Sequence, residues 1–291
     1  MKRLLTTLII AIVVLASALA VPSPAAAQSA LTRYPVIPSI RGGVASQARA
    51  LVRQGKRLGN RLNVFSKIGD SITAFGYFLT PIGAGGLQLG AYGNLADTVS
   101  FFSSEIARTN NSFANESLAA RGGWTTADLL EPAQATPGIC EAGETPVDCE
   151  LRVVKPSVAL IMIGTNEVTG GDVIGFRTRL TQIIRIVKKH GVIPVLSTIP
   201  YRRDSDPALN NVEAFNLAIV RLAANQAIPL WNYWLAVEAL PSNGISTDNV
   251  HPSVPEDGNT AIFDDYHLQY GFTMRNLTAL QVLNALRPVL K

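Results

Sequence analysis

The sequence predicts an α/β protein in which helices cover both faces of a parallel sheet. Short apolar segments that suit buried strands alternate with longer segments of helical periodicity, a pattern typical of parallel sheets. Of the 291 residues, 47% are hydrophobic and only 16% are charged, which excludes an intrinsically disordered chain. No internal repeat or linker divides the sequence. We therefore expect a leader and helix over residues 28–60 and a single domain over residues 61–291.

The first 27 residues have the order of a secretory signal peptide. Lys2 and Arg3 precede an apolar run over residues 4–21, and the small residues Ala25–Ala27 provide a cleavage site. A retained membrane anchor is the alternative, because about 18 apolar-biased residues approach spanning length. The small-residue site favours cleavage after Ala27. We expect a secreted, extracytoplasmic protein with no stable membrane span after cleavage.

Charge and cysteine content narrow the possible partners. Removal of residues 1–27 deletes two cations, which lowers the formal net charge from +4 to +2. No block of Lys and Arg is interleaved with aromatic residues, so nucleic acid is not an expected partner. Cys140 and Cys149 are an even pair in an exported chain, and we expect a disulfide that closes a surface loop. Zinc is a poorer explanation, because no histidine or second cysteine pair is close in sequence.

The first half of the chain contains one well-defined helix and one well-defined strand. Residues 28–43 contain proline and paired glycines and suggest an exposed leader, whereas residues 44–58 predict a helix that Gly59 ends. The first strand is expected over residues 64–68. The Gly-rich, aromatic residues 75–93 suit either a loop over a site or a disordered insertion. A second strand over residues 113–120 is the least defined element.

In the second half of the chain, predicted strands and helices alternate more regularly. The continuous apolar run over residues 157–163 predicts a strand buried on both faces, and residues 173–187 form an amphipathic helix pattern that ends at His190-Gly191. Further elements are expected as a strand over 192–197, a helix over 212–224, a strand over 228–231 and a helix over 277–290. Right-handed crossovers would place the carboxyl ends of all strands at one edge, where ligands bind in open α/β sheets.

Candidate chemical groups follow the strands. Ser71 comes directly after the first strand and Gly69-Asp70, a dipeptide that is also common in ordinary turns. Three further stretches are expected at the same edge: residues 123–126, 164–166 and 248–251. Ester hydrolysis by serine needs a hydroxyl, a base, an acid that orients the base and donors for the oxyanion, and these stretches contain such groups.

Only three histidines are available as the base. His190 lies at the end of a basic helix, where a cation suits the helix dipole, and His267 suits a surface or packing position. His251 follows Asp248 by three residues, so the carboxylate can reach its ring; a turn in which Asp248 merely caps a helix is the alternative. Asn166 is likewise either an oxyanion donor or an ordinary turn residue.

These blocks, in this order, resemble the SGNH superfamily of GDSL-type hydrolases. The resemblance spans residues 65–253 and implies a three-layer α/β/α fold with a flavodoxin-like sheet of five parallel strands. It also implies that Ser71 is the nucleophile, that His251 is the general base and then acid, and that Asp248 orients His251. The implied oxyanion hole consists of the backbone N–H groups of Ser71 and Gly123 and the side-chain amide of Asn166.

Two positions depart from the family pattern. The third block usually continues with Asp after Asn, whereas this chain has Glu167, which keeps the charge and lengthens the reach. The second block usually has Asn-x-Gly, whereas this chain has Arg121-Gly122-Gly123, so Gly122 is an alternative oxyanion donor. We expect little loss of function from the first departure. Asp70, next to Ser71, is expected to fix the turn that exposes the nucleophile.

The sequence therefore predicts a secreted serine esterase that works through an acyl-enzyme and needs no metal or other cofactor. The absence of a Gly-x-Ser-x-Gly segment disfavours the α/β-hydrolase arrangement. Export favours O-deacetylation of a polysaccharide, and a small-molecule acyl ester is the other substrate class considered. A lysophospholipase or short-chain lipid esterase, an acyltransferase, and a non-catalytic carbohydrate-binding surface protein remain alternatives.

Several large apolar side chains could face the substrate. They would form either a sugar-stacking platform or a lipid-accepting wall, with core packing as the alternative, particularly for Trp231. These side chains are Phe75, Tyr77, Phe78, Leu79, Trp124, Trp231 and Trp234.

Overall fold

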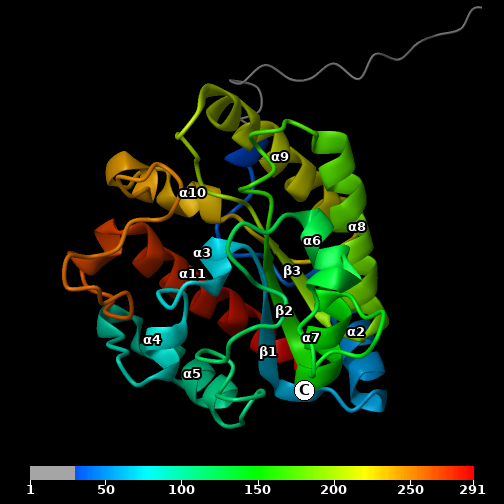
Figure 1. The fold of residues 1–291 in the computed structure, drawn as a ribbon. Coiled ribbons are helices and arrows are strands. Elements are labelled where there is room, and N and C mark those ends of the chain that lie inside the picture. Colours follow the sequence, from blue (N-terminus) through cyan, green and yellow to red (C-terminus); the bar gives the residue numbers. More distant parts are fainter. Residues whose placement is uncertain (1–29) are drawn as a thin grey trace, which may run out of the picture.

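The computed structural model describes residues 30–291 (Figure 1). The predicted signal peptide over residues 1–27 lies outside the described residues. Among the helices of residues 30–291, none is both long and apolar enough to cross a membrane.

A parallel sheet forms the centre of the fold, as the sequence predicted. Its strands lie in the order β1-β2-β3-β4, and almost every strand residue is buried: β1 (Arg61–Gly69), β2 (Pro156–Met162), β3 (Ile193–Ser197) and β4 (Leu230–Trp231). The ends of the strands are in register, since Gly69 pairs with Met162 and Ser197 pairs with Trp231. The segments that follow β1, β2, β3 and β4 therefore leave the sheet at a common edge.

The fifth strand expected over residues 113–120 does not form a strand in the described structure. It is reduced to a single parallel bridge between Gly69 and Ala120, in which the Gly69 N–H donates to the Ala119 carbonyl at 2.9 Å. Side chains take the place of the remaining ladder bonds. The Phe65 N–H donates to the Ser112 hydroxyl, and the Leu118 N–H donates to the buried Glu150 carboxylate.

Helices cover both faces of this sheet. The α-helices are α2 (Gly42–Arg57), α3 (Ser71–Ala74), α4 (Thr80–Gly83), α5 (Ala96–Ser103), α6 (Thr126–Leu130), α7 (Pro146–Val154), α8 (Val173–Lys189), α9 (Asp206–Asn225), α10 (Tyr233–Val237) and α11 (Gly271–Leu286). Short 3₁₀ turns occur at η1 (Gly90–Leu95), η2 (Pro132–Gln134), η3 (Pro241–Gly244), η4 (His267–Gln269) and η5 (Arg287–Val289).

Side chains of β1 point alternately to the two faces of the sheet, and each face is covered by a different layer of helices. The Ser66 hydroxyl donates to Glu150 of α7, whereas the neighbouring Phe65 packs against Phe102 of α5, and successive strand residues point to opposite faces. Helices α7, α8 and α9 contact one another in sequence, and α5 contacts α11 on the other side. Figure 1 shows these two groups on either side of the central strands, which confirms the α/β/α arrangement.

Two segments are more closely packed than their composition suggested. In the leader, Leu31 is fully buried, and the Asn232 side-chain amide donates to the carbonyls of Leu31 and Tyr34. Residues 75–93 form α4 and η1, and Asn276 of α11 anchors them by accepting from the Leu79 N–H and donating to the Tyr77 carbonyl, each at 2.9 Å. Backbone groups in both segments thus find partners in the domain.

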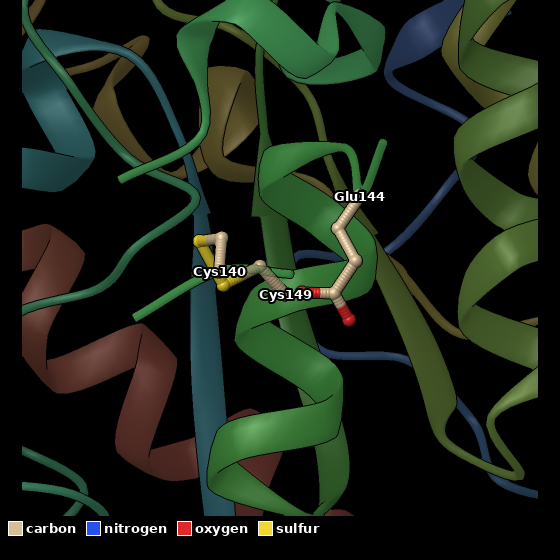
Figure 2. A group of neighbouring side chains, drawn as sticks. All are labelled: Cys140, Glu144 and Cys149. Carbon is tan, nitrogen blue, oxygen red and sulfur yellow. A yellow bond between two sulfur atoms is a disulfide. The ribbon is translucent and has the colours of Figure 1, made fainter. Parts of the chain in front are cut away.

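The predicted disulfide is present. Cys140 and Cys149 are joined with an S–S distance of 2.04 Å, and Cys149 is fully buried within α7 (Figure 2). The Glu144 carboxylate lies beside the pair and is held by Arg152 at 2.5 Å. Because both sulfurs are bonded to each other, this group of three side chains does not offer the thiolates that a zinc site would need.

Candidate active site

Ser71 stands at the carboxyl end of β1 because the chain makes a close turn there. A Cβ atom at Gly69 would lie 2.1 Å from the Met162 carbonyl oxygen, so only glycine fits the end of this strand. Asp70 then caps α3 by accepting the Ile72 N–H at 3.0 Å, and Ser71 is the first residue of the helix. Its backbone N–H has no intrahelical acceptor, as is usual for the first turn.

His251 and Asp248 lie in one tight loop. Asp248 Oδ1 accepts the Ser246 hydroxyl at 2.6 Å and the backbone N–H groups of Val250 and His251 at 2.9 Å, while Oδ2 lies 2.7 Å from His251 Nδ1. Partial burial acts to raise the pKa of Asp248, but the hydrogen bonds from Ser246, His251 and Val250 outweigh it and hold that pKa well below its usual range. The carboxylate is therefore ionised at neutral pH.

The loop brings the imidazole to the serine. His251 Nε2 lies 2.9 Å from Ser71 Oγ, although 180 residues separate them in sequence. Since the Asp248 carboxylate can only accept, Nδ1 of the neutral ring carries the proton and Nε2 offers a lone pair to the Ser71 hydroxyl. The Phe75 ring packs on the imidazole, with centroids 4.8 Å apart. The three side chains have the geometry that activates a serine nucleophile.

A tight turn at residues 121–124 lies beside Ser71. The Trp124 N–H donates to the Arg121 carbonyl at 3.3 Å, and Gly123 adopts φ +78°, as the third residue of a type II turn requires. A Cβ atom at Gly122 would lie 4.0 Å from the Cβ of Ser71. Among the described residues, neither Gly122 nor Gly123 finds an acceptor for its backbone N–H, so the turn offers two donors next to the serine.

Asn166 follows β2 at the same edge of the sheet. One N–H of its Nδ2 donates to the Trp124 carbonyl at 2.9 Å, and its Oδ1 accepts from Arg202 Nη1 at 3.2 Å. The second Nδ2–H has no acceptor within residues 30–291. Asn166 is thereby held on both sides of its amide and linked directly to the turn that carries Gly122 and Gly123.

Glu167, the departure from the family pattern, anchors that turn. Its Oε2 accepts the Thr126 N–H at 3.0 Å and its Oε1 accepts the Thr126 hydroxyl at 2.5 Å, at the start of α6. Arg179 of α8 lies 3.1 Å from the same carboxylate. The longer side chain thus connects the segment after β2 to the segment that contains the glycine turn, and both carboxylate oxygens are used.

A buried cation lies beneath α3, the helix that begins at Ser71. Arg275 of α11 is 1% exposed, donates to the Ile72 carbonyl and to Thr73 Oγ1, and stacks 3.6 Å from the centroid of Phe78. Burial raises the pKa of the Asp70 carboxyl to about 6, while the charge of Arg275 and the Ile72 N–H act in the opposite direction. The sequence motifs did not identify Arg275 or Arg202 as neighbours of the site. For Arg275, the one available signal was a charged residue within an otherwise apolar helix.

The other two histidines contact carboxylates other than Asp248. His190 pairs with Asp148 at 3.1 Å, at the end of α8, which is the sheet edge opposite to Ser71. His267 lies between Asp264 at 2.7 Å and Asp257 at 3.1 Å. Burial acts to lower the pKa of His267, but the two carboxylates outweigh it and raise that pKa. In the described structure, His251 is thus the histidine that contacts Ser71.

Most of the apolar candidates belong to the core. Phe78, Leu79, Trp124, Trp231 and Trp234 are at most 5% exposed. Only Phe75 and Tyr77 are substantially exposed, at 39% and 42%, and both pack against Phe272 of α11. They are the two large apolar side chains from the sequence prediction that remain available to a ligand.

Two cavities differ in place and lining. One, of about 160 Å³, borders α3 and is lined by polar side chains that include Lys67, Thr73 and Asn115. The other, of about 220 Å³, is apolar and lies between the leader and the residues that precede β4, including Tyr34 and Ile228. The polar cavity therefore borders α3, although neither Ser71 nor His251 lines it, and the apolar cavity lies toward the opposite edge of the sheet.

Comparisons with known proteins found similarities among solved structures. Similar solved structures include a GDSL-like lipase from Bacteroides thetaiotaomicron (14% identity, covering 81% of this chain and 98% of the other, TM-score 0.47). Others are a carbohydrate esterase family 3 protein from Talaromyces cellulolyticus (16%, 76% and 97%, 0.49) and an acetylxylan esterase from Geobacillus stearothermophilus (19%, 75% and 93%, 0.46). No curated protein sequence matches.

The family assignment rests on the sequence itself. The model of the GDSL-like lipase/acylhydrolase family matches residues 68–255, which is more than half of the chain and includes Ser71, Gly123, Asn166, Asp248 and His251. The resemblance inferred from the order of the four blocks is thus confirmed. The chain belongs to the GDSL-like lipase/acylhydrolase family, whose members are hydrolases that act on esters.

Proposed function

We propose that the protein is a secreted serine esterase in which Ser71, His251 and Asp248 are the catalytic residues. The observation that supports this most directly is the unbroken chain of contacts from Ser71 Oγ through the His251 ring to Asp248, at 2.9 and 2.7 Å. Each group also faces the partner that its role needs: a ring nitrogen for the hydroxyl and an ionised carboxylate for the ring.

The reaction proceeds in two halves. Ser71 Oγ attacks the ester carbonyl as its proton passes to His251 Nε2, and Asp248 stabilises the resulting imidazolium. The N–H groups of Ser71 and Gly123 and the Asn166 amide donate to the oxyanion, with Gly122 as the alternative backbone donor. The imidazolium then protonates the departing alcohol, which leaves an acyl group on Ser71. Water, deprotonated by His251, attacks this acyl-enzyme and releases the carboxylic acid and free serine.

We propose a short acyl ester of a carbohydrate as the substrate class. The exposed Phe75 and Tyr77 offer faces on which a sugar ring can stack, and Phe75 packs directly on the His251 ring. The same two rings would also suit an acyl chain, so a short-chain lipid esterase is the second candidate. The apolar cavity does not favour it, because that cavity lies away from Ser71.

The mechanism is tested with p-nitrophenyl acetate and with a fluorophosphonate probe. We expect Ser71→Ala and His251→Ala to abolish both hydrolysis and labelling, whereas the matched variants Ser104→Ala and His190→Ala should keep both. Ser104 lies at the exposed end of α5, and His190 pairs with Asp148. Equal hydrolysis by wild type and Ser71→Ala would disprove the serine mechanism.

The substrate class is tested separately. Rates on acetylated xylo-oligosaccharides are compared with rates on p-nitrophenyl esters of increasing chain length. A steep decline beyond acetyl or propionyl, together with rapid release of acetate from the sugars, supports carbohydrate deacetylation. Highest activity on octanoyl or longer esters would favour the lipid esterase instead.

A further inference from the structure

We propose that Arg202 is a positioning residue that fixes the orientation of the Asn166 side-chain amide, so that one of its N–H groups faces the reacting carbonyl. This inference rests on the proposed function for its catalytic consequence. The orientation itself is a structural property that can be measured without any reaction. No motif of the family resemblance contains Arg202, which lies in the loop after β3.

The guanidinium group of Arg202 connects three neighbours at once. Its Nη1 donates to the Thr165 carbonyl at 2.9 Å and to Asn166 Oδ1 at 3.2 Å. Its Nε and Nη2 donate to the two carboxylate oxygens of Asp204, both at 2.8 Å. The side chain is only 14% exposed, so these contacts are shielded on most sides by protein.

These contacts decide which way the Asn166 amide points. A reversed amide would place its NH₂ group against the cationic Nη1 of Arg202 and its oxygen against the Trp124 carbonyl, so both contacts would become repulsive. In the observed orientation both contacts are favourable. The remaining Nδ2–H then has a fixed direction, as an oxyanion donor requires before the charge develops.

The residue type matters as much as the charge. Arginine presents a planar fork that can bind a carboxylate with two nitrogens and still direct the third nitrogen elsewhere. A lysine ammonium at this position could approach Asp204 or Asn166 but could not hold both in the same geometry. Asp204 also offsets the charge of Arg202, so the expected contribution is orientation of the amide and not attraction of an anion.

The first experiment measures orientation. In ¹⁵N–¹H spectra of the full mature protein, the Asn166 side-chain amide is assigned by its absence in Asn166→Asp. We expect this signal to shift or broaden in Arg202→Met and to stay unchanged in Arg203→Met. Arg203 is the matched control, because it carries the same charge in the same loop but hydrogen-bonds to Ser242 and Asn243. An Asn166 signal that is identical in wild type and Arg202→Met would overturn the proposal.

The second experiment measures the catalytic consequence as a double-mutant cycle. Loss of an oxyanion donor costs roughly 10²- to 10³-fold in kcat, so we expect Asn166→Ala to lose this much and Arg202→Met to lose about 10- to 100-fold with little change in KM. Arg202→Lys should recover part of the loss. The double variant should be no slower than Asn166→Ala alone, because Arg202 acts through Asn166. Fully multiplicative losses would contradict the proposal.

The two experiments separate the proposals from each other. If Ser71→Ala hydrolyses esters at the wild-type rate, the proposed function fails, yet the spectra still decide whether Arg202 orients Asn166. If Ser71→Ala is inactive but the Asn166 signal does not respond to Arg202→Met, the esterase mechanism stands and the positioning role is wrong.

Discussion

The carboxyl group of Asp70 should make the folded protein less stable as the pH rises from about 4 to about 7. Asp70 is fully buried, and burial raises its pKa from 3.8 to about 6 in the folded protein, against the opposing effects of Arg275 and the Ile72 N–H. Between these two pH values the folded state holds the proton more tightly than the unfolded state. Since one pKa unit corresponds to about 1.36 kcal/mol, the folded protein loses about 3 kcal/mol across this range.

Comparison with Asp70→Asn isolates this contribution. Asparagine can still cap α3 but does not titrate, so the pH dependence that the two proteins do not share reports on Asp70. Urea unfolding from pH 3.5 to 7.5 should show the free energy of unfolding of Asp70→Asn rising relative to wild type by about 3 kcal/mol, with the change centred between pH 4 and 6. The exposed Asp264 provides a control of opposite sign, because contacts with His267 lower its pKa. A pH-independent difference between wild type and Asp70→Asn would refute the reasoning.

Four further outcomes are expected. Replacing Glu167 by Gln weakens the contacts with Thr126 and Arg179, so kcat for p-nitrophenyl acetate should fall about tenfold or more, and Glu167→Asp should recover part of that loss. Unchanged rates would show that these contacts are dispensable. Phe75→Ala should raise KM for acetylated sugars more than for p-nitrophenyl acetate, and equal effects on both would argue against stacking. Reduction of the Cys140–Cys149 bond should lower the free energy of unfolding, measured in urea, by about 2–3 kcal/mol, because the bond closes a short loop. No change would mean that the bond adds no stability. Treatment with EDTA should leave esterase activity intact, whereas strong, zinc-reversible inhibition would contradict the metal-free mechanism.

Strand and helix positions could largely be predicted because their patterns are local. The apolar run over residues 157–163 corresponds to β2, and the helical spacing after Val173 corresponds to α8, which begins at that residue. The prediction of a strand over residues 113–120 was wrong for a reason that no local pattern reveals. Its place at the sheet edge depends on the Ser112 hydroxyl and the Glu150 carboxylate, which bind backbone N–H groups that a strand would have paired.

Segments that carry the candidate chemistry could be predicted as well, because each follows a strand or lies in a motif of short spacing. The residues that support these segments could not be predicted from the sequence. Arg202 reaches Asn166 across 36 positions and Arg275 reaches Ile72 across 203. Such contacts depend on the full three-dimensional arrangement, and the sequence near each arginine is equally compatible with a solvent-exposed side chain. The role of Glu167 was hidden for the same reason, since its partner Thr126 lies 41 positions away.

The distance along the chain between Ser71 and its supporting residues also has a consequence for the order of folding. During synthesis, a chain that extends only through β4 already contains Ser71, the glycine turn and Asn166. It contains neither His251 nor Arg275, whose side chains reach Ser71 Oγ and the Ile72 carbonyl of α3. Such an intermediate can assemble the sheet but has no base for the serine. Esterase activity should therefore be acquired late, after the segment with His251 has been added, and shortened chains that end after β4 should be inactive even if they remain compact.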